Sequence, residues 1–174
     1  MREANLRSAF HGWNAFTAIE WDTALCLHVP GNMRMIQMGW DDLWLQRVVS
    51  RYFHNVDRRI FGNAHTRRGV RSNRLVTMEH SVGVGWHSHI IASTPPSVSQ
   101  DDFRSLLKKE WLRLTEHYAS NAFKKRLVWV EPLTDGYADY CTKYAFSDLS
   151  GNINSQSVAP AMGTVDWQNT HFSE

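Results

Sequence analysis

Apolar positions along this chain follow two different periods, and each change of period marks a new element. Thr23–Val29, with the sequence TALCLHV, is a short apolar run closed by Pro30-Gly31-Asn32, which predicts a strand. A helical period follows within Asp41–Phe61 and predicts a helix that ends at Gly62-Asn63. The apolar stripe of that helix comprises Leu43, Leu45, Val48, Val49, Tyr52, Phe53, Val56 and Ile60.

The stretch from Leu75 to Ala92 carries the clearest signal in the chain. Two apolar runs, Leu75–Met78 and Trp86–Ala92, are joined by the Gly-rich connection Ser81–Gly85. Short apolar runs separated by a few residues that include glycine are typical of a β-hairpin. The arginine-rich segment Asn63–Arg74, interpreted as a loop, leads into it.

The second half of the chain contains a helix, a strand and another helix. Ser97 or Ser99, followed by Asp101 and Asp102, begins a helix that extends to about Ala119. Its buried stripe is predicted to comprise Phe103, Leu106, Leu107, Trp111, Leu114 and Tyr118. A strand over 127–130 and a helix over about 136–146 follow, and residues 147–174 are expected to be mostly loop.

The predicted order is therefore strand, helix, hairpin, helix, strand, helix. This order indicates an α+β fold in which helices pack on an antiparallel sheet and the hairpin lies at its centre. One domain over residues 1–147 is expected, with residues 148–174 as a C-terminal extension or linker.

Composition sets the broad class. The chain is 43% hydrophobic and 21% charged, which is ordinary for a globular protein, and no apolar run approaches the ~18 residues of a membrane span. Cys26 and Cys141 are far apart, so both are interpreted as free thiols in a reducing, cytoplasmic compartment. A net charge of +2 permits nucleic-acid binding without arguing for it.

The hairpin carries a candidate metal site. His87 and His89 are two apart on one strand and share a face, and Glu79 lies across the turn within cross-strand reach. Two imidazoles and a carboxylate form a divalent-metal site with open positions. His80 should point to the opposite face. Because the chain has nine histidines, a His-x-His sequence has a substantial probability of occurring by chance. The competing interpretation is a pair of surface histidines.

A second motif lies on the last predicted helix. Tyr140 and Lys143 are one turn apart, so both can address one phosphate. Tyr137 and Tyr144 share that face, and for them packing on the sheet is the favoured interpretation. A phenol is a poor nucleophile at neutral pH, whereas a metal can stabilise charge on a phosphodiester undergoing in-line displacement. The two motifs therefore belong to one reaction.

Basic residues cluster before the hairpin. Arg67, Arg68, Arg71 and Arg74 have no acidic neighbour in their segment and are assigned to contacts with a DNA backbone. A solvated loop is the competing interpretation.

These motifs resemble the HUH endonuclease superfamily, in particular the replication-initiator (Rep) nucleases of rolling-circle plasmids and viruses. Thr23–Leu27 stands at the first motif, Glu79, His87 and His89 match the metal motif, and Tyr140 with Lys143 matches the third. The middle residue of the histidine motif is usually bulky and apolar in the family, whereas here it is Ser88. The resemblance covers about residues 20–147.

The resemblance implies a ferredoxin/RRM-like sheet, a Mg²⁺ or Mn²⁺ ion, and site-specific nicking of single-stranded or hairpin origin DNA. Tyr140 would be the nucleophile and would become linked to the 5′-phosphate, leaving a free 3′-hydroxyl. No P-loop motif is present, so a helicase would act in trans or from a C-terminal region outside this sequence.

Three alternatives stay open. The first is an HUH-type transposase or relaxase with the same chemistry. The second is a non-catalytic RRM-like module that binds single-stranded nucleic acid and needs no metal. The third is a structural zinc site, which usually has four ligands including thiolates, and neither cysteine is near the hairpin in sequence. Tyr137 remains a weaker alternative nucleophile.

Overall fold

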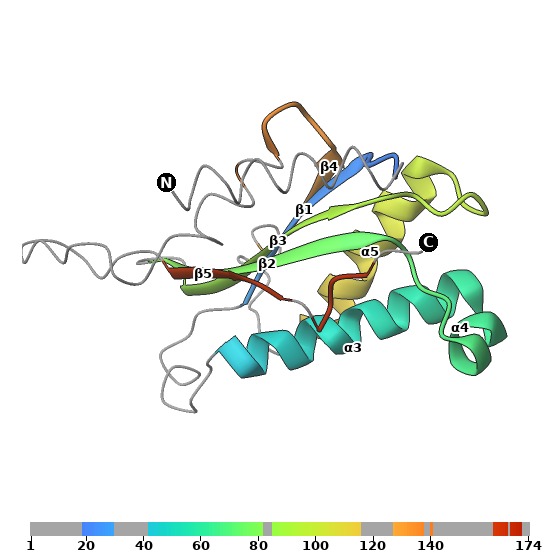
Figure 1. Ribbon diagram of the computed structural model, residues 1–174, viewed down its shortest axis with the longest axis horizontal. Helices are drawn as coiled ribbons and strands as arrows, with labels where there is room; N and C mark the ends of the chain where they lie inside the picture. The colour runs from blue at the N-terminus through green and yellow to red at the C-terminus, as the bar shows by residue number, and fades with distance from the viewer. Residues whose placement is uncertain are drawn as a thin grey trace, which may run out of the picture.

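The computed structural model describes residues 19–29, 42–81, 85–115, 127–137, 140, 162–166 and 168–171. These residues form an α+β structure, as the sequence predicts (Figure 1). Its elements in chain order are β1 (Thr23–His28), α3 (Asp42–Phe61), α4 (Asn63–Arg68), β2 (Arg74–Ser81), β3 (Gly85–Ala92), α5 (Gln100–Thr115), β4 (Val128–Pro132) and β5 (Met162–Val165).

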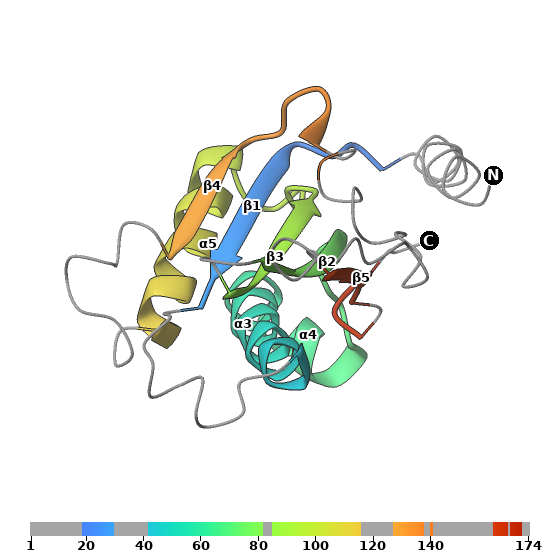
Figure 2. The same cartoon turned by 90° about the vertical axis from the view of Figure 1, so that its left-hand side faces the viewer.

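The strands form one antiparallel sheet in the order β4-β1-β3-β2-β5. The hairpin of β2 and β3 lies at its centre, which confirms the predicted position of the His-x-His strand. The first four strands follow the order β4-β1-β3-β2 with one helix after β1 and another after β3, an arrangement compatible with a ferredoxin-like fold. Helices α3 and α5 cover the same face of the sheet (Figures 1 and 2).

The core lies between those helices and the sheet. Side chains from both layers are fully or almost fully buried there, including Leu25, Leu27, Val49, Tyr52, Phe53, Val56, Val76, Ile90, Phe103, Leu107 and Trp111. The two polar tips in this core are satisfied, because the Tyr52 hydroxyl donates to the carbonyl of Leu107 and the Trp111 indole donates to that of His28. One predicted core position is wrong, since Leu43 is 55% exposed at the start of α3.

The start of α5 shows why the helix begins there. The Ser99 hydroxyl accepts from the backbone N–H of Asp102 at 3.2 Å and donates to the Asp102 carboxylate at 2.7 Å. A side chain that satisfies a free N–H of the first turn is a stabilising N-cap. Of the two predicted starting residues, Ser99 is therefore the one that caps.

Two segments predicted as loops contain regular structure. Asn63–Arg68 is the short helix α4, which ends at Gly69, where φ is +69°. Residues 147–174 were expected to be mostly loop, but Met162–Val165 pairs with β2 and extends the sheet. Backbone pairing between sequence-distant strands depends on partners that no local pattern reveals.

Candidate metal centre

Sheet register brings the three predicted metal ligands together. Glu79 pairs directly with His87 across the hairpin, and His89 lies two residues further along β3, so all three side chains share one face. This face is opposite the one that α3 and α5 cover, because the alternating residues Ser88 and Ile90 are buried in the core. Ser88 thus occupies the core-facing position between the histidines.

The three side chains are buried and close. Glu79, His87 and His89 are 7%, 4% and 4% exposed, and one ligand atom from each lies within 4.8 Å of the other two. His87 Nε2 is 3.8 Å from one carboxylate oxygen of Glu79, and His89 Nε2 is 3.3 Å from the other. Ligands about 2.0–2.2 Å from a shared ion stand roughly 3 to 3.5 Å apart. The distance from His89 to Glu79 has this spacing, and the distance from His87 to Glu79 is slightly longer, so the group could hold a metal ion.

The tautomer of His87 supports the same conclusion. Its Nδ1 lies 3.0 Å from the carbonyl of Gly85, which can only accept, so Nδ1 carries the proton. In the neutral ring Nε2 then presents a lone pair toward the Glu79 carboxylate. Metal-binding histidines commonly use one ring N–H to donate to a backbone carbonyl, which leaves the second ring nitrogen free to bind the metal. His87 has this orientation. The donor set thus fits a divalent metal.

Two residues of β1 beside the metal centre were missed from sequence. His28 stacks on His87 with ring centroids 5.4 Å apart, and Cys26 Sγ is 3.2 Å from His28 Nε2. Burial and then the neighbouring His87 lower the pKa of His28 to about 4, so its ring is neutral at pH 7. Cys26 is the cross-strand partner of His89, although it does not belong to the ligand cluster. The alternation of Cys26 and His28 along TALCLH was the available signal.

Tyr140 lies at the metal centre. Its ring centroid is 4.9 Å from that of His89, and the residue is 46% exposed. Its backbone N–H bonds to the carbonyl of Gly136 at 3.0 Å, as in a helical turn. Tyr137 is held differently, since its hydroxyl donates to the Leu25 carbonyl at 2.6 Å. Of the two described tyrosines near His89, Tyr140 is therefore the more exposed and the closer one.

Several sequence predictions fall outside the described residues. They concern Lys143, Tyr144, Cys141 and Tyr118.

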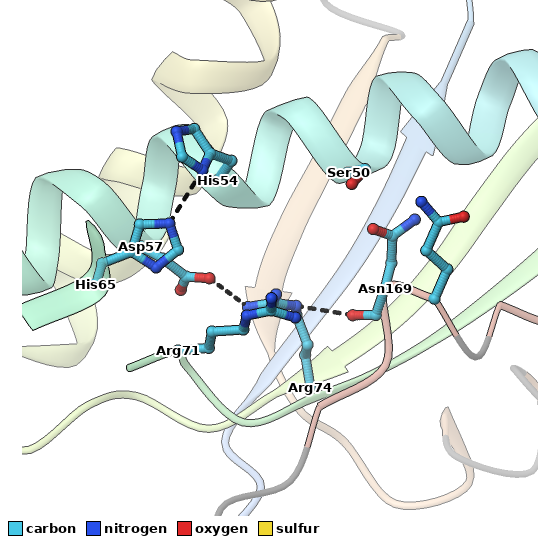
Figure 3. A pocket seen from close by; sticks show the side chains of 8 residues that line it. Ser50, His54, Asp57, His65, Arg71, Arg74 and Asn169 are labelled. Atoms are coloured by element: carbon cyan, nitrogen blue, oxygen red, sulfur yellow. Dashed lines mark hydrogen bonds and ion pairs between the residues drawn. The ribbon is translucent and has the colours of Figure 1, made fainter. Parts of the chain in front are cut away.

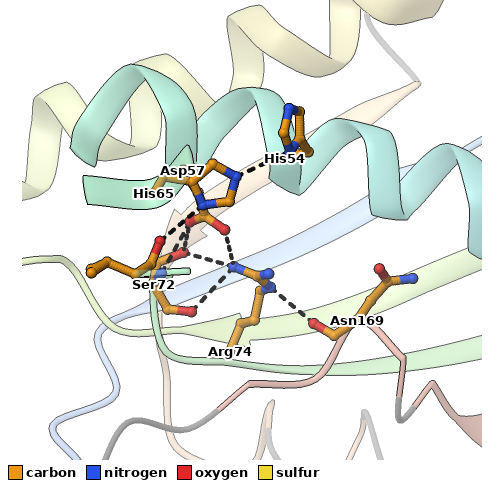
Figure 4. Close-up of polar contacts among 7 residues, drawn as sticks. His54, Asp57, His65, Ser72, Arg74 and Asn169 are labelled. Carbon is orange, nitrogen blue, oxygen red and sulfur yellow. Dashed lines mark hydrogen bonds and ion pairs between the residues drawn. The ribbon is translucent and has the colours of Figure 1, made fainter. Parts of the chain in front are cut away.

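Arg67, Arg68 and Arg71 are exposed, as a DNA-contacting role requires. Arg74 is not: it is 3% exposed, and its Nη1 lies 2.8 Å from the Asp57 carboxylate of α3 (Figure 4). Its Nε donates to the carbonyl of Asn169, and its guanidinium lies 4.2 Å above the Phe53 ring. Arg74 therefore differs from the other three arginines, because it is buried and joins α3, β2 and the turn after β5.

Replacing Asp57 with alanine is expected to destabilise the fold strongly. The carboxylate pairs with Arg74 and also accepts from the N–H and hydroxyl of Ser72, so its loss leaves a buried cation unpaired. Breaking one partner of a buried ion pair costs about 3–5 kcal/mol. Urea denaturation of Asp57→Ala measures this cost. The control is Asp101→Ala, which removes a carboxylate that pairs with Arg104 but is 95% exposed and screened by water, so the free energy of unfolding should change far less.

No helix in the described part of the chain is long and apolar enough to cross a lipid bilayer. Comparison of the chain with protein-family models, with curated proteins and with solved structures finds no match.

Proposed function

We propose that this protein is a metal-dependent, site-specific single-stranded DNA endonuclease and strand transferase of the HUH type. The observation that carries the proposal is the placement of an accessible phenol, Tyr140, against His89 of a buried Glu79–His87–His89 cluster. A nucleophile beside a metal-ligand set is what phosphodiester cleavage through a tyrosine requires. The four residues come from three separate segments of the chain. Their meeting at one place is therefore less expected by chance than the occurrence of a His-x-His motif in the sequence.

The proposed roles follow from the geometry. Glu79, His87 and His89 would hold Mg²⁺ or Mn²⁺, which would supply stabilisation of charge on phosphate oxygens. The Gly85 carbonyl keeps the His87 ring oriented, and His28 packs on the other side of that ring. Lys143 is proposed to neutralise the phosphate, as one turn of helix after Tyr140 would allow.

The proposed reaction conserves the number of phosphodiester bonds. The Tyr140 hydroxyl loses its proton to solvent and its oxygen attacks phosphorus. The bond between phosphorus and the 3′-oxygen breaks, and that oxygen takes up a proton. The products are a 5′-phosphotyrosyl protein and a free 3′-hydroxyl, so rejoining needs no nucleoside triphosphate. This chemistry would serve initiation of rolling-circle replication, and a transposase or relaxase would use the same steps.

The finer description of the fold as ferredoxin/RRM-like belongs to the same proposal. It is supported by the strand order β4-β1-β3-β2 and by the packing of both long described helices, α3 and α5, on one face. In such sheets single-stranded nucleic acid lies on the face opposite the helices. The candidate metal centre is on that opposite face, so the strand to be cut would cross it.

The deciding experiment uses a pool of random single-stranded oligonucleotides with Mn²⁺. A band that resists SDS and carries both protein and DNA is the expected result, because a phosphotyrosine bond survives denaturation. Chelation of the metal should remove it. Sequencing the attached DNA ends then gives the preferred site.

A second candidate is a non-catalytic single-stranded nucleic-acid-binding module, and Trp129 favours it. This side chain is 41% exposed on β4, on the same face and in the same register row as Cys26 and His89. Its ring lies 5.4 Å from that of Tyr137. The module predicts binding without metal and without any adduct.

Both candidates predict that Trp129 stacks on a base. Trp129→Ala should weaken single-stranded DNA binding by about 1–3 kcal/mol, the usual contribution of one base–aromatic stack. Trp129→Phe keeps a ring and should recover most of the affinity. Fluorescence anisotropy with a labelled oligonucleotide measures both, and equal losses in the two variants would argue against stacking.

A further inference from the structure

A second polar site lies away from the metal centre, between α3, α4 and the turn that follows β5 (Figure 3). It is a cavity of about 210 Å³, and every side chain that lines it is polar or charged. Arg74, in its lining, is five residues from Glu79 along β2, roughly 17 Å at about 3.4 Å per residue. The two sites are therefore separate.

Arg74, one of the two arginines that line this cavity, is rigidly held. Arg74 is fixed by Asp57 and Ser72 through Nη1 and by the Asn169 carbonyl through Nε (Figure 4). The Phe53 ring also lies against its guanidinium plane. Among the residues that the structure describes, no acceptor takes the protons of its Nη2. A guanidinium with one fixed and uncommitted edge is a preorganised donor for an anion.

The charge of the lining is not balanced. Arg71 and Arg74 both line the cavity, whereas Asp57 is the one carboxylate there, and Arg71 is exposed and forms no ion pair with any described residue. The excess positive charge also acts on His171. Its pKa is lowered first by burial and then by the positive charges of Arg74 and Arg71. An anion would relieve this repulsion.

The opposite wall contains two histidines that bond to each other. His65 Nδ1 is 2.9 Å from the carbonyl of Val70, so this nitrogen carries a proton, and His65 Nε2 faces His54 Nδ1 at 3.0 Å. When both rings are neutral, His65 Nε2 accepts from His54, which fixes both rings and uses both of their N–H groups. Gln168 adds an exposed side-chain amide to the lining. The guanidinium groups of Arg71 and Arg74 and the Gln168 amide therefore supply donors to the cavity from different segments.

We propose that this cavity binds a phosphate group, carried by a nucleic-acid strand, by free phosphate or by a small phosphorylated molecule. Guanidinium and amide donors from different directions match a tetrahedral oxyanion with several acceptor oxygens better than a planar carboxylate. The volume equals that of about seven waters at ~30 Å³ each, enough for a phosphate group and part of its substituent. The proposal stands independently of the metal centre and of nicking.

The test compares Arg71→Ala with Arg58→Ala, a matched control that removes the same charge from α3 at a residue outside the cavity lining. Both arginines are exposed, so both variants should fold. Calorimetric titration of inorganic phosphate, in chelator and at constant ionic strength, is the first arm. Binding of a single-stranded oligonucleotide, followed by anisotropy over a range of salt concentrations, is the second.

Arg71→Ala is expected to weaken binding roughly ten-fold or more, because one charge-assisted hydrogen bond contributes that much, and Arg58→Ala less than about two-fold. A loss in the phosphate arm alone identifies a free or small phosphorylated ligand. A loss in the oligonucleotide arm, with the salt slope reduced by about one, identifies a strand backbone. If the two variants behave alike in both arms, the proposal is overturned. Since no metal is present, this outcome leaves the nicking proposal untouched.

Discussion

Tyr140→Phe should abolish the covalent protein–DNA adduct and lower strand cleavage by roughly three orders of magnitude or more, since the reaction loses its nucleophile. The phenyl ring retains the contact with His89, whose centroid is 4.9 Å away, so the site should keep its shape. Affinity for single-stranded DNA should change little. The measurements are an SDS gel with labelled oligonucleotide and Mn²⁺, and anisotropy on the same DNA.

The matched control is Tyr137→Phe. Tyr137 lies three residues earlier and packs near Tyr140, with ring centroids 6.0 Å apart, but its hydroxyl is engaged by the Leu25 carbonyl. Losing that bond should cost about 0.5–1.5 kcal/mol of stability and leave the adduct in place. An adduct that persists in Tyr140→Phe and disappears in Tyr137→Phe would transfer the nucleophile role to Tyr137. Adducts in both single variants would exclude either tyrosine as the sole nucleophile.

Glu79→Gln should remove metal binding without changing the size of the side chain. A divalent cation here depends on one carboxylate and two imidazoles, and the amide supplies no negative charge to balance it. For the unaltered protein, Mn²⁺ at about 100 times its dissociation constant should add roughly 2.7 kcal/mol to the free energy of unfolding. In Glu79→Gln that increment should fall to near zero. Thermal melting with and without Mn²⁺ measures the difference and does not depend on activity.

His80→Ala is the control for the metal experiment. His80 is adjacent to Glu79 on β2 but points to the other face, where its ring lies 5.1 Å from that of Trp86. This variant should keep the metal-dependent rise in melting temperature even if its baseline stability changes. Equal rises in Glu79→Gln and in the unaltered protein would show that the metal binds elsewhere.

The candidate centre was predictable because its ligands belong to one hairpin. In a strand pair the register follows from the turn and from the alternation of buried residues, so Glu79 opposite His87 and the shared face of His89 could be inferred from spacing. The helices were also predictable from local sequence. The apolar stripes of α3 and α5 repeat over a few residues, and Ser99 caps α5 through Asp102, three positions away.

The rest depended on partners far along the chain. Arg74 looked like a surface arginine because neither Asp57, 17 residues earlier, nor Asn169, 95 residues later, is visible from its own segment. The strand order β4-β1-β3 likewise placed Cys26 and Trp129 in one row with His89.

By itself, then, the sequence determined the hairpin with its three candidate metal ligands, the two packed helices and the nearness of two tyrosines on one later segment, since periodicity and turn chemistry act over a few residues. The tertiary structure decided which tyrosine stands beside His89, which arginine is buried, and that β5 completes the sheet. Those outcomes depend on burial and charge pairing between distant segments, which no local pattern specifies.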